Sequence, residues 1–83
     1  MLTGKWKPQL FRLASIAPLR FSTLLKKIPG VSKQSIAVAL KELEQDGLLQ
    51  RIVIKEKPLH VEYTLTDKGI TLIPVFHQLE SLL

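Results

Sequence analysis

The 83-residue sequence contains no cysteine. Without a thiol, the chain has no disulfide framework, no thiolate zinc site and no switch based on cysteine oxidation. Long apolar runs are also missing, because the longest stretches fall far short of the roughly 20 residues that span a bilayer. Residues 1–8 lack the apolar segment of a signal peptide. We therefore expect a cytoplasmic protein with no membrane association.

Acidic residues are few: seven Asp and Glu stand against twelve Lys and Arg, which gives a net charge of +5. Such an excess favours a polyanionic partner, because neutralising phosphates releases their counterions. The hydrophobic fraction of 46% is typical of a chain that folds. At this length we expect residues 1–83 to form a single domain whose small core gains from a partner subunit.

Hydrophobic periodicity and helix breakers divide the first part of the chain. A first helix is predicted over about Pro8–Ala17, with its first residue at Pro8 and a stop at the next proline. Leu19–Phe21 follows as a short extended piece. Ser22 or Thr23 then caps a second helix, which a Pro-Gly pair ends.

The third helix carries the clearest signals. Ser32 stands at its N-cap, good helix formers fill about Lys33–Asp46, and Gly47 supplies the left-handed stop. Leu49–Lys55 and His60–Leu65 are rich in β-branched and aromatic residues and predict two strands joined by a polar turn. N-cap chemistry at the following threonine opens a last helix to about residue 82, which an internal proline is expected to kink.

This order of elements predicts an α+β winged helix-turn-helix fold, with a three-helix core, a β-hairpin wing and a C-terminal helix. Two helices joined by a tight turn and followed by a two-stranded ribbon place a helix in the major groove of DNA with a wing beside it.

The third helix has two different faces. Ile36, Leu40 and Leu43 fall on one side and are expected in the core. The opposite side offers Gln34, whose amide can pair with adenine, and Lys41 for phosphate or guanine, with small apolar residues between them for thymine methyl groups. The predicted recognition residues are Ser32, Lys33, Gln34, Ser35, Ala37, Val38 and Lys41. An ordinary solvated helix face is the alternative.

Two further groups extend the predicted DNA contact. Ser32 and Lys33 add a hydroxyl, a cation and free backbone N–H groups that suit a phosphate oxygen. Lys55, Lys57 and His60 gather near the tip of the hairpin, where a wing meets the DNA backbone or the minor groove. A plain solvated turn would also explain this second group.

Six segments stand in a fixed order along the chain: Gly4-Lys5-Trp6, Leu19-Arg20-Phe21, Ile28-Pro29-Gly30-Val31-Ser32, Leu40-Lys41-Glu42-Leu43-Glu44, Asp46-Gly47-Leu48 and Val61-Glu62-Tyr63-Thr64-Leu65-Thr66-Asp67-Lys68-Gly69. As an ordered set they resemble the HxlR-type winged-helix regulators over nearly the entire chain. The resemblance implies a dimeric bacterial or archaeal transcription factor. Its third helix would enter the major groove, its hairpin would be the wing, and its terminal helices would pair two subunits.

The chain departs from this family pattern in three places. Only three residues precede Gly4, where the family usually has an extension, often with a cysteine, so part of the dimer contact and thiol sensing are expected to be missing. Ala37, Val38 and Ala39 occupy positions that are commonly more polar, which predicts fewer hydrogen bonds to bases. His60 stands where arginine is common, and a neutral imidazole attracts phosphate less than a guanidinium does.

The last helix carries apolar residues over about half of its circumference, more than one thin domain covers. We expect a two-fold homodimer through this helix and part of the first. The predicted interface is Trp6, Leu10, Leu13, Leu72, Val75, Phe76, Leu79, Leu82 and Leu83. Intramolecular core remains the alternative for Trp6 and for the phenylalanines Phe11 and Phe76.

Other functions find little support. His60 and His77 lie in different elements without metal-ligand spacing, and there is no glycine-rich phosphate loop, so we expect no catalysis, no metal and no cofactor. The carboxylates of the third helix are explained by surface pairing with lysines. A protein-interaction or RNA-binding winged helix is the alternative function, and the lysines on both candidate faces favour DNA instead. No small-molecule effector is indicated, and economy favours a repressor that competes with polymerase and lies on the nucleoid when bound.

Overall fold

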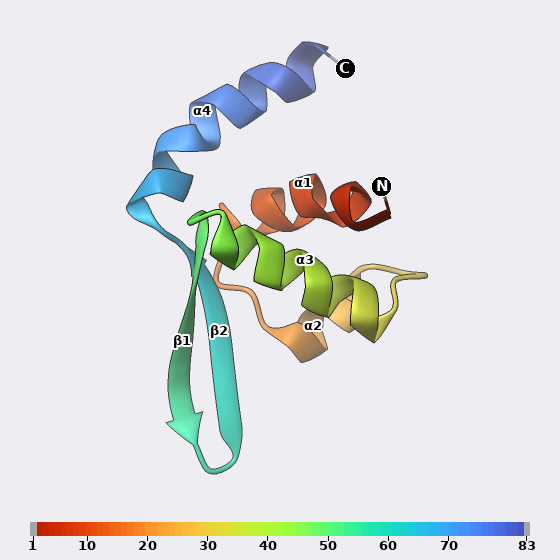
Figure 1. Ribbon diagram of the computed structural model, residues 1–83, viewed down its shortest axis with the longest axis vertical. Helices are drawn as coiled ribbons and strands as arrows, with labels where there is room; N and C mark the ends of the chain where they lie inside the picture. Colours follow the sequence, from red (N-terminus) through yellow and green to blue (C-terminus); the bar gives the residue numbers. More distant parts are fainter. Residues whose placement is uncertain (1, 83) are drawn as a thin grey trace.

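The computed structural model describes the backbone of residues 2–82 and the side chains of residues 6–82 (Figure 1). Its elements, in chain order, are α1 (Leu2–Ala14), α2 (Phe21–Lys27), α3 (Lys33–Gln45), β1 (Leu49–Glu56), β2 (Leu59–Leu65) and α4 (Asp67–Leu82). The first three helices pack together, while the hairpin and α4 extend toward opposite ends of the 43 Å long axis (Figure 1). The predicted winged helix-turn-helix architecture is confirmed.

The core is formed by the inward faces of α1, α2 and α3 with the first residue of β1. Each buried leucine or isoleucine contributes about 1.5–3 kcal/mol relative to an exposed one, so this cluster fixes how α3 lies on α1. The predicted inward stripe of α3, at residues 36, 40 and 43, is confirmed. The buried apolar residues are Leu10, Phe11, Ala14, Leu19, Leu24, Ile28, Ile36, Ala39, Leu40, Leu43 and Leu49.

The predicted limits of the first helix, Pro8–Ala17, were wrong at both ends. Pro8 lies inside α1, which begins at Leu2. A proline lacks only its own backbone donor, and Trp6 packs against the core upstream of it, so apolar contact stabilises helix before the proline. Downstream, Ser15 N–H and Ala17 N–H still donate to carbonyls of α1, so the chain leaves the helix through a turn rather than at once.

The second helix begins one residue before the predicted cap. Arg20 is the N-cap residue of α2 and makes no side-chain capping bond, while Ser22 and Thr23 lie exposed within the helix. The extended piece before it is confirmed, because Leu19 and Tyr63 exchange two backbone hydrogen bonds of 2.8 Å. This bridge ties the segment between α1 and α2 to the base of β2.

The predicted ends of α3 are confirmed to within one residue. The Ser32 hydroxyl accepts a 3.0 Å hydrogen bond from the backbone N–H of Ser35, which is the expected N-cap contact. Gly47 has a φ of 78°, the left-handed conformation that stops the helix. Only Asp46, Gly47 and Leu48 separate α3 from β1, so a short connection joins the helix to the hairpin.

The hairpin is longer than predicted. Lys55 and His60 lie in the strands as predicted, but β1 continues to Glu56 and β2 begins at Leu59, so only two residues form the turn. The reason is that Glu56 pairs with Leu59 and continues the antiparallel ladder to the tip. One register shift, between Val53 and Lys55, leaves a bulge in β1.

The start of α4 is held close to the loop after α3. The Thr66 hydroxyl accepts a hydrogen bond from Gly69 N–H at 3.1 Å, which confirms the predicted N-cap. A Cβ at Gly69 would lie 2.5 Å from the Leu48 carbonyl oxygen, so only glycine permits this approach. Pro74 lies inside the helix, as predicted. Within residues 2–82, every helix is too short or too polar to cross a membrane.

Candidate nucleic-acid interface

The outward face of α3 is free to meet a partner. Gln34, Ala37 and Lys41 are exposed and Val38 is half-buried. Among the described residues, none of these side chains makes a hydrogen bond or an ion pair with another part of the chain. Gln34 and Lys41 are seven residues apart, which is about 10 Å along the helix axis and close to two full turns. The face thus presents an amide and an ammonium group on the same side of the helix.

Ala39 does not belong to this face, although the resemblance to the HxlR-type regulators grouped it with Ala37 and Val38. Its side chain is fully buried in the core. The helical turn of 100° per residue carries Ala39 to the inner side, beside Leu40 and Leu43. The expectation that Ala39 weakens base reading was therefore wrong, while Ala37 and Val38 keep the predicted positions.

At the start of α3, two serines satisfy each other. The Ser32 hydroxyl donates to the Ser35 hydroxyl at 2.9 Å, besides accepting from its backbone N–H. Lys33 is exposed next to them. The first backbone N–H groups of a helix have no partner within it, so Lys33 and these amides are the groups best suited to a phosphate.

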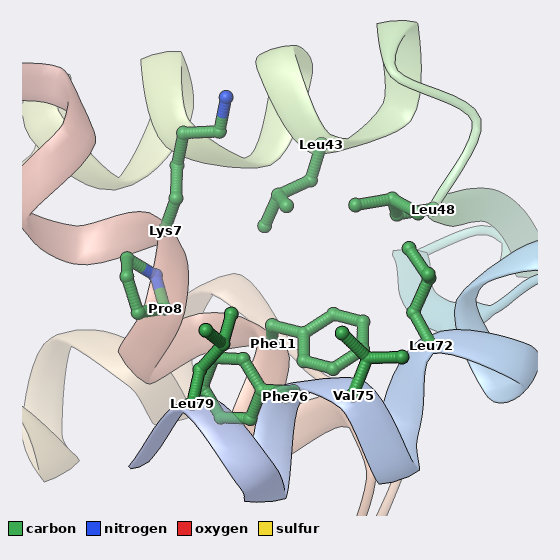
Figure 2. A pocket seen from close by; sticks show the side chains of 9 residues that line it. All are labelled: Lys7, Pro8, Phe11, Leu43, Leu48, Leu72, Val75, Phe76 and Leu79. Carbon is green, nitrogen blue, oxygen red and sulfur yellow. The ribbon is translucent and has the colours of Figure 1, made fainter. Parts of the chain in front are cut away.

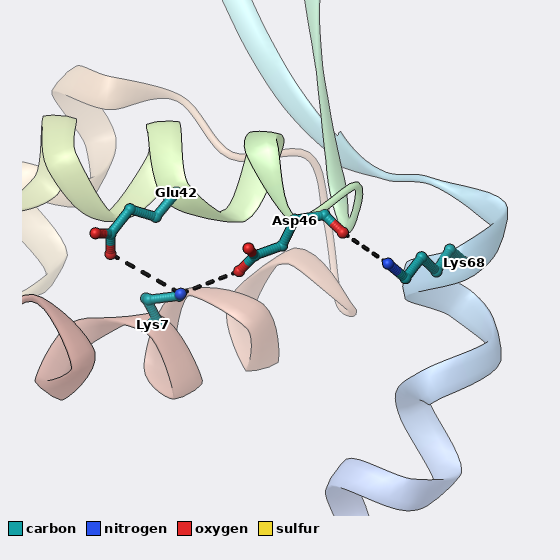
Figure 3. Close-up of polar contacts among 4 residues, drawn as sticks. All are labelled: Lys7, Glu42, Asp46 and Lys68. Carbon is teal, nitrogen blue, oxygen red and sulfur yellow. Dashed lines mark hydrogen bonds and ion pairs between the residues drawn. The ribbon is translucent and has the colours of Figure 1, made fainter.

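A cation from α1 holds the other end of α3 (Figure 3). Lys7 Nζ lies 3.0 Å from Asp46 Oδ2 and 3.9 Å from Glu42 Oε1. Lys68 Nζ donates to the Asp46 carbonyl oxygen at 2.8 Å. The surface pairing expected for these carboxylates thus links three helices that are distant in sequence, and it fixes the end of α3 relative to α1 and α4. Each exposed pair contributes about 0–1 kcal/mol.

The predicted wing residues differ in their surroundings. Lys55 and Lys57 are exposed, but His60 is half-buried and its Nε2 lies 3.0 Å from Glu62 Oε2. Side chains two apart on a strand share a face, so this pairing was visible in the sequence and was missed. Arg51, an exposed cation of β1, was also missed. The wing therefore presents Arg51, Lys55 and Lys57 as cations, while His60 is engaged within the hairpin.

A groove of about 410 Å³ separates α4 from the body of the molecule (Figure 2). Phe76 of α4 contacts Phe11 of α1, with ring centroids 4.9 Å apart. Apart from Lys7 at one side, the lining is apolar, and several of its side chains are incompletely covered. The lining residues are Lys7, Pro8, Phe11, Leu43, Leu48, Leu72, Val75, Phe76 and Leu79.

The predicted interface residues fall into two groups. Leu10 is 0% exposed and lies in the core, so its assignment to a dimer surface was wrong. Trp6 and Leu13 are half-buried against the same core. Val75, Leu79 and Leu82 are exposed on α4, Leu72 and Phe76 are half-buried, and Leu83 lies outside the described residues. Helical periodicity cannot distinguish a side that meets the core from a side that meets a partner.

Among the described residues, no three His, Asp or Glu side chains lie close enough together to hold a metal ion. The carboxylates described above are occupied by lysines or by His60. His77 is exposed on α4.

A free outward helix linked to a projecting hairpin defines the class of winged helix-turn-helix proteins. Residues 1–83 match the family described as HxlR-like helix-turn-helix, and the chain belongs to that family. The resemblance seen in the six ordered segments is thereby confirmed. The chain is a DNA-binding transcriptional regulator of the helix-turn-helix type.

The chain is similar to known regulators over most of their length. An uncharacterized HTH-type transcriptional regulator of Halalkalibacterium halodurans, BH0655, is 40% identical over 80 residues, which are 95% of this chain and 71% of that protein. YodB of Bacillus subtilis is 36% identical, over 98% of this chain and 72% of its own. The solved structure of reduced YodB matches with a TM-score of 0.83 and 37% identity, over 96% and 79% of the two chains. A regulator of Enterococcus faecalis assigned to the MarR family matches with a TM-score of 0.86 and 32% identity, over 98% and 74%.

Proposed function

We propose that residues 1–83 form one DNA-binding domain that represses transcription as a homodimer, with α3 in the major groove of double-stranded DNA. The observation that carries this proposal is the outward face of α3, where Gln34 and Lys41 are exposed and unpaired among the described residues. Glutamine pairs with adenine through two hydrogen bonds, and lysine reaches guanine or phosphate. Ala37 and Val38 between them allow the helix to lie deep in the groove.

The hairpin supplies the second contact in this proposal. Lys55 and Lys57 are exposed at the far end of the ribbon, where they reach phosphates beside the site of α3. Their contribution is independent of sequence and depends on salt, because it arises from counterion release. His60 contributes indirectly, since Glu62 holds its ring within the hairpin.

Dimerisation in this proposal uses α4 and the groove beneath it. Val75 and Leu79 line that groove and remain exposed, and Leu82 is 78% exposed near the end of the helix. Apolar surface of this kind on a small domain is typical of an interface, and a two-fold axis would let each α4 cover the other subunit. Two recognition helices would then meet half-sites about one turn of DNA apart.

The proposal also covers the mode of regulation and the location of the protein in the cell. A domain without catalytic machinery acts by occupying its site, so repression by steric competition with polymerase is the simplest mode. We assign it to the cytoplasm of a bacterium or archaeon and to the nucleoid when bound. No cofactor or small-molecule effector is part of the proposal.

Binding to DNA tests the proposal directly. The intact protein is titrated with random duplexes of about 30 base pairs across a salt series, beside a variant with both Gln34→Ala and Lys41→Ala. We expect the variant to bind at least about tenfold more weakly and to lose about one unit of the salt slope, because one phosphate or base contact and one amide pair are removed.

Two results would contradict the proposal. Absence of binding to duplex DNA even at low salt would favour a protein-interaction module. Tighter binding to single-stranded RNA than to duplex DNA would favour the RNA-binding alternative.

A further inference from the structure

Apolar side chains remain exposed along the whole outer part of the hairpin. Ile52, Val53, Ile54 and Leu59 all lie beyond the core, and Leu59 is 63% exposed at the first position of β2. Leu59 is six residues from Leu65 at the base, so it stands roughly 20 Å out along the ribbon. Single exposed leucines are common on proteins, but Val53 and Leu59 share one face of this thin ribbon, and exposed apolar residues grouped in this way are typical of a contact surface.

The register of the hairpin sets the direction of these side chains. Because Val53 pairs with Val61 while Lys55 pairs with His60, Ile54 is the extra residue of a bulge. Bulges re-aim the side chains that follow them. Here the shift places Lys55 opposite His60 and leaves Leu59 on the same face as Val61. Near the tip, one face of the ribbon therefore carries Leu59 and Val61 with Glu56, and the other carries Lys55 with His60.

Charge at the tip identifies the kind of partner. Lys55 is exposed near the end of β1, Lys57 is exposed in the turn itself, and the exposed Pro58 precedes Leu59 directly. The one carboxylate at the turn is that of Glu56, the cross-strand partner of Leu59. Two ammonium groups near the tip, one of them on the face opposite Leu59, suit phosphates on both sides of a groove that the leucine enters. The minor groove of DNA offers such a site, and proteins insert apolar wedges there between base steps.

We propose that Leu59, with Pro58 beside it, is an apolar wedge that enters the minor groove and partly unstacks one base step, while Lys55 and Lys57 contact the flanking phosphates. This inference rests on the proposed DNA binding and adds how the wing contacts DNA. Unstacking at a flexible pyrimidine–purine step kinks the duplex. The wing would then select for deformable sequence without any hydrogen bond to a base.

The test uses a duplex that the intact protein selects from a random pool, with 2-aminopurine replacing each adenine in turn. The fluorescence of this base rises when it loses its stacking neighbours. With saturating protein we expect a several-fold rise at one position outside the half-sites. Leu59→Ala should abolish that rise and weaken binding about tenfold, because three carbons lose their buried contacts.

Two control variants separate the wedge from general binding. Lys57→Ala should weaken binding and lower the salt slope by about one, yet keep the fluorescence rise at saturation. Ile16→Ala removes an even more exposed apolar side chain, far from the hairpin in sequence, and should change nothing. Circular dichroism checks that each variant folds.

Each outcome is decisive. An intact protein that selects a duplex but produces no rise at any adenine overturns the wedge and leaves the proposed function standing. A rise that persists in Leu59→Ala overturns it as well, as does a change in the sedimenting mass of that variant, which would make Leu59 part of a protein contact. Failure to select any duplex overturns both proposals.

Discussion

The hairpin and α4 each carry several exposed apolar residues away from the core, and they lie toward opposite ends of the molecule (Figure 1). Their charges differ. The hairpin adds three cations, Arg51, Lys55 and Lys57, to two carboxylates. Residues 67–82 carry one lysine against two carboxylates, and a wide apolar groove lies beneath them.

This difference indicates different partners for similar residue types. An apolar side chain among exposed ammonium groups suits a surface of phosphates, whereas an apolar stripe with little charge suits another protein surface. Hydrophobicity alone therefore does not identify either site, and the neighbouring charges decide. The core separates the two sites, so substitutions in one should leave the other intact.

The largest effect is expected from charge placed in the groove. Val75→Glu with Leu79→Glu should convert a dimer into a monomer, because two carboxylates would be desolvated in an apolar interface. Binding to a two-half-site duplex should weaken about a hundredfold through the loss of avidity. Sedimentation equilibrium and a gel-shift titration measure the two effects.

A matched control exists on the same helix. Ile70 is 54% exposed and Leu79 is 55% exposed, but Ile70 does not line the groove. Ile70→Glu should therefore leave the sedimenting mass unchanged. Equal loss of the dimer in Ile70→Glu would show that the groove does not define the interface.

A smaller effect is expected at the hairpin. Lys55→Ala with Lys57→Ala should weaken DNA binding about tenfold and lower the salt slope by about two, to a similar degree on every sequence. The sedimenting mass should stay the same. A salt series by fluorescence anisotropy measures both affinity and slope, and an unchanged slope would remove the wing from the DNA contact.

The smallest effect concerns the acid at the tip. Glu56→Gln removes the one carboxylate that faces the same ribbon edge as Leu59, so DNA binding should strengthen about twofold at low salt. The gain should vanish at high salt because exposed charges are screened. Weaker binding in this variant would mean that Glu56 accepts a hydrogen bond from DNA, contrary to our account of the wing.

The sequence predicted α3 well because several local signals agree there. The Ser32 cap, the inward stripe that includes Ile36 and Leu40, and the stop at Gly47 all depend on neighbours within one helix. The outward positions of Gln34 and Lys41 follow from the same periodicity. Local chemistry was therefore sufficient for the candidate recognition face.

The errors arose where distant residues meet. Leu10 was assigned to an interface because periodicity does not say which neighbour covers an apolar side, and α3 covers it in the fold. The pairing of Lys7 with Asp46 joins residues 39 apart in sequence and had no local signal. Pro8 was taken as a helix start because proline favours the first position of a helix. The sequence does not show that Trp6 packs against the core, which stabilises helix upstream of Pro8.

The measurement that tests the central claim most directly is the change in backbone amide NMR shifts on adding the selected duplex. DNA contact by α3 and the wing predicts large changes at residues 32–41 and 55–60, with small changes along residues 72–82. Changes concentrated on α4, with residues 32–41 unaffected, would contradict the assignment of the two surfaces.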